Sequence, residues 1–80
     1  MKLPNNYFKV ETKIYYQNRI HIEKDFFAEK SNAETFFNTK YMEVANGFIQ
    51  NRYKEYIVTL AECEHDIKLT KVLKIRNAPQ

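Results

Sequence analysis

The fold is decided by the stretch SNAETFFNTKYMEVANGFIQNRY, which runs from Ser31 to Tyr53. Apolar side chains recur in it mainly at steps of three and four residues, a spacing that places them on one stripe of a helix. The stripe consists of Ala33, Phe37, Tyr41, Val44, Ala45 and Phe48, and it is widened by Phe36 and Ile49. Ser31 followed by Glu34 matches a capping box, so the sequence predicts a helix that begins at Ser31.

The end of this helix has two possible positions. The pair Asn46-Gly47 is typical of a helix C-terminus or a tight hairpin. Phe48 stays on the apolar stripe, however, and a glycine at position 47 would permit a close approach to a sheet. We therefore expect the helix to continue to about Tyr53, with an end at Asn46 as the alternative.

Two segments before the helix are predicted to form a hairpin. In the first, residues Tyr7 to Tyr16 alternate strictly, which is typical of a strand with one covered face. Polar residues from Gln17 to Arg19 form the turn, and a second strand runs from Ile20 to Phe27. The adjacent Phe26 and Phe27 interrupt the alternation, so a bend or bulge is expected there. The first strand presents Phe8, Val10, Thr12, Ile14 and Tyr16 on one face and Tyr7, Lys9, Glu11, Lys13 and Tyr15 on the other.

Two more strands are predicted after the helix. The nearly continuous apolar run from Tyr56 to Ala61 is typical of a strand in the middle of a sheet. In the last strand, Ile67, Leu69, Leu73 and Ile75 are predicted to face the core, with Lys68, Thr70, Val72, Lys74 and Arg76 opposite. The order strand, strand, helix, strand, strand predicts an α+β fold (ββαββ), in which one helix packs on one face of a four-stranded antiparallel sheet.

Length and composition favour one intracellular domain. Eighty residues form a single unit, and its segments 1–6 and 77–80 are expected to be mobile. The one cysteine, Cys63, has no partner for an internal disulfide, so the fold needs no oxidising compartment. The first residues have no apolar segment of the kind found in signal peptides, and no run is long enough for a membrane span. We therefore expect a cytoplasmic protein that does not bind membranes.

The chain contains no set of residues that predicts catalysis. Cys63 and His65 are too few for a structural zinc site, which requires four ligands. His21 and Glu23 lie two residues apart without a nucleophile, and a surface contact between strands is the simpler interpretation. Because Gly47 is the only glycine, glycine-rich loops that hold phosphates are excluded. The expectation is a protein that is not an enzyme and has neither a cofactor nor a metal site.

The charge is moderately basic and unevenly distributed. The net charge is +3 and the isoelectric point is about 9.0. Lysine and arginine gather in the last strand, next to an acidic corner at residues 62–66. These cations have two interpretations. They either lie on a solvated strand and prevent it from aggregating, or they contact phosphate groups.

Rings and cations on two strands form the predicted binding surface. It consists of Tyr7, Lys9, Lys13 and Tyr15 on the first strand and Lys68, Lys71, Lys74 and Arg76 on the last. Such a surface could stack bases and hold the phosphates of RNA. It could also anchor a protein, because tyrosine and arginine are enriched at interfaces and sheet edges accept added strands. Binding of a protein is favoured over binding of RNA alone, and dimerisation remains open.

The hairpin Tyr7 to Phe27, followed by the helix Ser31 to Tyr53 and a further strand, resembles the small host-takeover and anti-toxin proteins of T-even-type bacteriophages. The resemblance covers about the first 63 residues. In size and charge the chain resembles the basic toxin inhibitory factors of that group. This resemblance implies an inhibitor that binds a host endoribonuclease toxin of an abortive-infection system, with RNA as a candidate component of the complex. It assigns no role to single residues.

Overall fold

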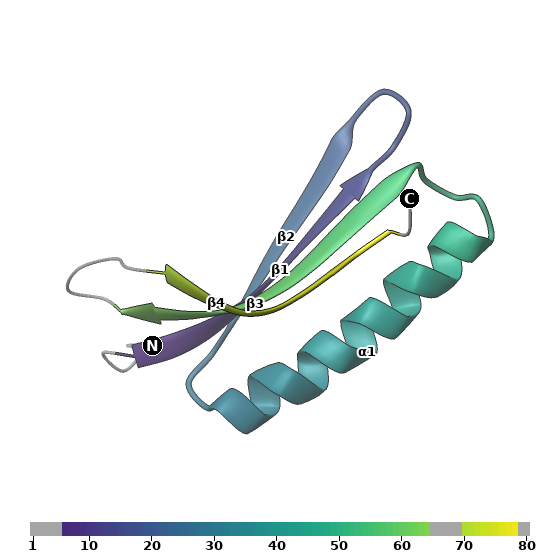
Figure 1. Ribbon diagram of the computed structural model, residues 1–80. Coiled ribbons are helices and arrows are strands. Elements are labelled where there is room, and N and C mark those ends of the chain that lie inside the picture. The colour runs from purple at the N-terminus through teal and green to yellow at the C-terminus, as the bar shows by residue number, and fades with distance from the viewer. Residues whose placement is uncertain (1–5, 65–69, 79–80) are drawn as a thin grey trace.

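In the part of the chain that the structure describes, the strands form one antiparallel sheet, and a single helix lies along one face of it (Figure 1). The computed structural model describes residues 6–64 and 70–78. Its elements are β1 (Asn6–Tyr15), β2 (Ile20–Phe27), α1 (Lys30–Ile49), β3 (Glu55–Glu64) and β4 (Thr70–Asn77). The strand order is β2-β1-β3-β4, so β1 and β3 are central and β2 and β4 form the edges. The predicted α+β fold is confirmed.

The hairpin of β1 and β2 is regular along its whole length. Its turn is closed by the Tyr16 amide, which donates a 2.9 Å hydrogen bond to the Arg19 carbonyl. The register then continues without a shift until Phe8 pairs with Phe27, so the bulge expected at Phe26 and Phe27 is wrong. The two adjacent rings lie on opposite faces of the sheet. Phe26 contacts Tyr7 on one face, while Phe27 contacts Phe36 of the helix on the other.

The helix begins and ends at positions that differ from the predicted ones. It starts at Lys30 after the N-cap residue Glu29, which makes no side-chain capping bond. Ser31 already lies in the first turn, where its carbonyl accepts a 3.0 Å bond from the Thr35 hydroxyl, so the predicted capping box is wrong. The helix ends at Ile49, between the two predicted ends.

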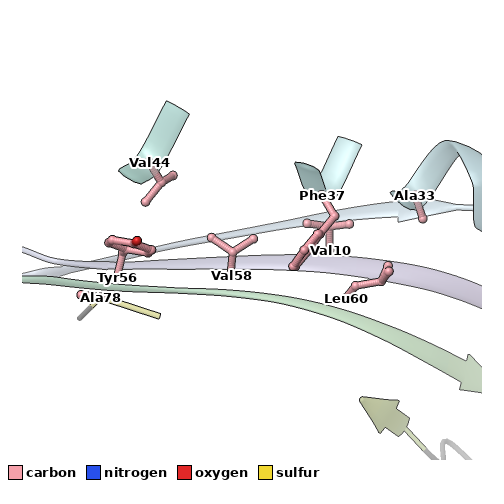
Figure 2. Close-up of a cluster of buried hydrophobic side chains, with 8 residues drawn as sticks. All are labelled: Val10, Ala33, Phe37, Val44, Tyr56, Val58, Leu60 and Ala78. Atoms are coloured by element: carbon pink, nitrogen blue, oxygen red, sulfur yellow. The ribbon is translucent and has the colours of Figure 1, made fainter. Parts of the chain in front are cut away.

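The core lies between α1 and the face of the sheet that it covers. Figure 2 shows Ala33, Phe37 and Val44 of the helix pointing toward Val10, Val58 and Leu60 of the central strands. All six are at most 5% exposed, as the predicted stripe requires. Tyr56 and Ala78 complete this cluster.

Both ends of the described chain lie in or directly beside strands of the sheet. Asn6 belongs to β1 and Asn77 to β4. Ala78 is buried, and its amide donates a 3.1 Å hydrogen bond to the Tyr56 carbonyl. The expected mobility of segments 1–6 and 77–80 therefore stays a prediction, and residues 1–5 and 79–80 lie outside the described residues.

The pairing register assigns each strand residue to one of two faces. Residues directly opposite each other in a sheet share a face. The face that carries Val10, Val58 and Leu60 is here called the covered face, because α1 packs on it. The other is called the open face. It carries Tyr7, Lys9, Glu11, Lys13 and Tyr15 of β1, Ile20, Ile22, Lys24 and Phe26 of β2, Glu55, Ile57, Thr59, Ala61 and Cys63 of β3, and Val72 and Ile75 of β4.

A bulge in β4 reverses the predicted faces of its last residues. Lys74 pairs with Leu60 while Val72 pairs with Ala61, so Leu73 is an extra residue at the shift. For Val72 and Leu73 the prediction is confirmed, since Val72 lies on the open face and Leu73 packs against the core. The predicted faces of Ile67, Lys68 and Leu69 lie outside the described residues. After the bulge the prediction is wrong. Ile75 lies on the open face and is 51% exposed, whereas Lys74 and Arg76 lie on the covered side, opposite Leu60 and Val58.

Candidate interaction surface

The open face is bordered on both edges by exposed apolar side chains. On β2 these are Ile20, Ile22 and Phe26, and on β4 they are Val72 and Ile75. Each of the five is between 49% and 56% exposed. Single exposed apolar residues are common, but a group on one face that no helix covers is a candidate docking surface. This group is the main candidate site of the protein.

Charged side chains form a row along the middle of this face. Lys9, Glu11 and Lys13 follow one another on β1, and each is half-buried. The Lys24 ammonium lies 3.9 Å from the Glu11 carboxylate across the β1–β2 pair. With Glu55 of β3, the described part of the face has three lysines and two glutamates, so its charge is slightly positive. A complementary surface would supply apolar groups at the borders and carboxylates near Lys9 and Lys13.

One end of the open face is closely packed. The rings of Tyr7 and Phe26 are 5.9 Å apart, and Tyr7 also lies opposite Cys63. Cys63 is only 4% exposed, although the helix covers the other face. Desolvation raises the pKa of the Tyr7 hydroxyl, and the neighbouring Cys63 adds to the increase. Tyr7, Phe26 and Cys63 thus gather at this end of the open face.

The predicted binding surface is divided between the two sides of the sheet. Tyr7, Lys9, Lys13 and Tyr15 lie together on the open face, as predicted. Lys71, Lys74 and Arg76 instead lie on the covered side of β4, and Lys68 falls outside the described residues. The two groups therefore do not form one surface.

The cations of β4 reach solvent because α1 is placed over the other three strands. The helix packs on β3, β1 and β2, while β4 lies at the sheet edge. Long lysine and arginine side chains can therefore extend past the helix into water. The Lys74 ammonium lies 3.7 Å from the Glu34 carboxylate of α1. The Arg76 guanidinium donates a 3.0 Å hydrogen bond to the Ile75 carbonyl.

Sequence reasoning missed the apolar borders. In the sequence Ile20 and Ile22 alternate with His21 and Glu23, but alternation does not show which face is covered. The length of the turn decides it, because it fixes which residues of the two strands lie opposite each other. Closing the hairpin with Tyr16 and Arg19 places Ile20 opposite Tyr15 and Ile22 opposite Lys13, on the face away from the core.

A cluster of charges links β2 to the helix on the covered side. The Glu23 carboxylate contacts the His21 imidazole and the Lys40 ammonium, each at 3.0 Å. The hydrogen bond with His21 and, next, that with Lys40 lower the pKa of Glu23. Lys40 also lies 5.5 Å from the centre of the Phe36 ring. The cluster holds the helix against the hairpin, and we assign it a structural role.

The outer flank of α1 has a shallow hollow of about 560 Å³. It is lined by Tyr41, Met42, Glu43, Ala45, Asn46 and Ile49. Met42 and Ile49 are 69% and 75% exposed. All of these residues belong to one helix, so the hollow is an open flank and not a cleft between elements.

Within residues 6–64 and 70–78 no group of three or more histidine, cysteine, aspartate or glutamate residues could hold a metal ion. In the same part of the chain no helix is long and apolar enough to cross a membrane. Comparisons with family models, with curated proteins and with solved structures found no match to this chain.

Proposed function

We propose that this protein is a non-enzymatic inhibitor that docks through its open face onto a partner protein and blocks it without turnover. The proposal is carried by one observation. Five large apolar side chains on the borders of the open face are about half exposed, and α1 packs only on the opposite face. Burying a large apolar side chain contributes about 1.5–3 kcal/mol relative to full exposure, so covering the borders would favour association.

The charge row adds specificity to this surface. Lys9 and Lys13 lie between the apolar borders, where a docking partner would exclude water from them. A lysine desolvated without a partner costs free energy, so the surface selects partners that place carboxylates there. Such a partner is acidic over a narrow strip and apolar on both sides of it.

The class of partner comes from the resemblance described above. We propose a host defence factor, specifically an endoribonuclease toxin, as the target, and the bacterial cytoplasm as the place where the inhibitor acts. Nucleic-acid-binding enzymes are basic where they hold RNA, so an inhibitor with lysines on its face would bind such a toxin beside the RNA-binding surface. RNA bound to that surface of the toxin would then be a further component of the complex.

A co-expression experiment tests this function. An endoribonuclease toxin of an abortive-infection system arrests bacterial growth, and co-expression of this protein should restore it. The double variant Lys9→Glu with Lys13→Glu should abolish the rescue, because it reverses the charge of the open face. The matched control Lys30→Glu with Lys54→Glu changes two exposed cations that lie outside that face, and it should still rescue growth.

A biochemical readout separates inhibition from expression effects. The tagged protein should retain the toxin on an affinity column in a stoichiometric complex, and a ribonuclease treatment should show whether RNA is part of it. Equal rescue by the wild type and by the open-face variant would overturn the docking surface. No retention of any such toxin would overturn the inhibitor itself.

The alternative function is that of an autonomous RNA-binding module. One observation favours it: Tyr7, Tyr15, Lys9 and Lys13 share one face, with Phe26 beside them. Rings and cations on an open sheet can stack bases and contact phosphates. The division of the cations between the two sides of the sheet weakens this alternative, since an RNA strand on the open face would not reach Lys74 or Arg76. Recovery of RNA without a protein partner would favour it.

A further inference from the structure

The two edges of the sheet carry opposite charges on the covered side. On the edge strand β2 the covered side has His21, Glu23 and Asp25. On the edge strand β4 it has Lys71, Lys74 and Arg76. On the open side both edges are mainly apolar, as described above. The two edges are therefore complementary in charge and similar in hydrophobicity.

Strand direction is also compatible with pairing between these edges. Neighbouring strands in the order β2-β1-β3-β4 are all antiparallel, so β2 and β4 run in opposite directions. If a second copy is placed beside the first in the same orientation, its β2 lies antiparallel to β4. The helices of both copies are then on the same side, and both open faces point the same way.

On both edges, the residues whose backbone groups point away from the sheet carry their side chains on the same face. In an antiparallel pair, residues alternate between those that bond to the neighbouring strand and those that point away from it. The Tyr16–Arg19 bond places Ile20, Ile22, Lys24 and Phe26 among the outward residues of β2. The bond from Ala78 to Tyr56 places Ile75 and Asn77 among those of β4. Those of these outward residues that were assigned to a face above all have side chains on the open face. Two copies can therefore form a continuous sheet with their open faces on the same side.

We propose that β2 of one copy pairs with β4 of a second copy, so that the protein associates edge to edge into a continuous antiparallel sheet. Pairing Ile75 with Ile22 of the next copy brings two apolar side chains together on the open face. The same register places Lys74 opposite Glu23 and Arg76 opposite His21 on the covered side. The Arg76 guanidinium, which now bonds to the Ile75 carbonyl, releases that carbonyl to the incoming strand.

The same structure limits the strength of this association. The bulge at Leu73 restricts the regular part of the β4 edge to about Lys74–Asn77, so few backbone bonds can form. Glu23 and Lys74 already have the partners Lys40 and Glu34. Exposed ion pairs contribute only about 0.2–1 kcal/mol each, and salt weakens them. We therefore expect association that depends on concentration and decreases as salt is added.

Edge pairing would place several open faces side by side. Because the interface joins two different edges, each copy still has one free edge after pairing, and further copies can add. An array of open faces raises the apparent affinity for a partner that is itself multivalent. This consequence extends the proposed function, but the pairing itself does not depend on it.

The test uses proline at outward positions of the two edges. Ile22→Pro and Ile75→Pro each remove an amide that points away from the sheet, a position where an edge strand tolerates proline. Circular dichroism and thermal melting check that both variants fold. In sedimentation equilibrium at low salt, the average mass of the wild type should rise with concentration beyond that of two copies. Each variant alone has one intact edge but no complementary edge to pair with, so it should stay monomeric.

The decisive sample is an equimolar mixture of the two variants. Ile22→Pro has an intact β4 edge and Ile75→Pro has an intact β2 edge, so the mixture should form complexes of two copies and no larger ones. A second variant keeps the backbone intact: Lys74→Glu with Arg76→Glu should stay monomeric alone and pair with Ile22→Pro. The control Lys30→Glu with Lys54→Glu should associate like the wild type. A wild type that is monomeric at about 1 mM would overturn the proposal, as would self-association of either proline variant alone.

Discussion

Gly47 lies directly against the phenol ring of Tyr53, and the fold leaves no room there for a side chain. A Cβ atom at position 47 would lie 2.8 Å from the ring carbon Cζ of Tyr53. The Tyr53 hydroxyl donates a hydrogen bond to the Val44 carbonyl. The centre of the Tyr53 ring lies 5.7 Å from the centre of the Tyr16 ring, and the two rings meet edge to face. The glycine therefore permits a close approach, as predicted, but to the segment after the helix and not to the sheet.

The first prediction concerns Gly47→Ala. Alanine favours a helix interior by about 1 kcal/mol over glycine, but its methyl group would displace the Tyr53 ring. The displacement loses a hydrogen bond worth about 0.5–1.5 kcal/mol and ring packing of similar size. We expect a net loss of about 1 kcal/mol in the free energy of unfolding, measured by urea denaturation.

A second background separates the two effects of this substitution. In a Tyr53→Ala protein the ring is absent, so Gly47→Ala should stabilise by up to about 1 kcal/mol. Destabilisation of similar size in both backgrounds would show that Tyr53 is not the cause.

The second prediction concerns Thr12, which is 1% exposed on the covered face. Its hydroxyl is the one buried side-chain polar atom without a hydrogen-bond partner among the described residues. Valine has nearly the same shape and needs no partner, so Thr12→Val should stabilise by about 1 kcal/mol. For a domain of this size that gain raises the melting temperature by about 4–8 °C.

Thr59→Val serves as the control for Thr12→Val. Thr59 lies half-buried on the open face, and substitutions at such sites usually change stability by less than about 0.5 kcal/mol. Equal melting temperatures for Thr12→Val and the wild type would mean that the Thr12 hydroxyl has a partner in solution.

Most of the fold could be predicted because the spacing of apolar residues in the sequence agrees with the structure in three of the four strands and in the helix. Strict alternation in β1 and the continuous apolar run in β3 identified the central strands. The capping box failed because the helix begins one residue before Ser31, which leaves the Ser31 side chain inside the first turn. Local sequence signals locate a helix better than they locate its first residue.

The binding surface was predicted only in part because one inserted residue reverses a strand. Beyond Leu73, the side chains of β4 change faces, and this moved Lys74 and Arg76 away from Lys9 and Lys13. The adjacent apolar pair Val72 and Leu73 interrupts the alternation and was the available signal. A bulge depends on how the strand fits its neighbour, and single-strand patterns do not contain that information.

The third prediction concerns the pH dependence of the Glu23 cluster. Its bonds with His21 and Lys40 lower the pKa of Glu23 from the ordinary value of 4.5. The unfolded chain therefore binds the proton more tightly, so this stabilisation is complete above pH 4.5 and is lost as pH falls through the lowered pKa. Because the side chain is 42% exposed, the contribution is only about 0.5–1 kcal/mol.

Glu23→Gln measures this contribution. Its free energy of unfolding should lie below that of the wild type at pH 7, and the difference should shrink as the pH approaches 3. Glu43→Gln removes the same charge from an exposed site on α1 and should leave the pH dependence unchanged. A deficit of Glu23→Gln that is equal at pH 7 and pH 3 would contradict the assignment.

The fourth prediction concerns the salt dependence of RNA binding. If single-stranded RNA binds the open face, its phosphates can contact only Lys9, Lys13 and Lys24 among the described residues. Each phosphate contact contributes a slope of about 0.7 in log affinity against log salt, so the total slope should not exceed about 2. Fluorescence anisotropy with a labelled oligonucleotide measures it, and Lys9→Glu with Lys13→Glu should reduce the slope to about 0.7. A steeper slope that falls in Lys74→Glu with Arg76→Glu would place the RNA on the covered side of β4 instead, because only there do those two cations lie.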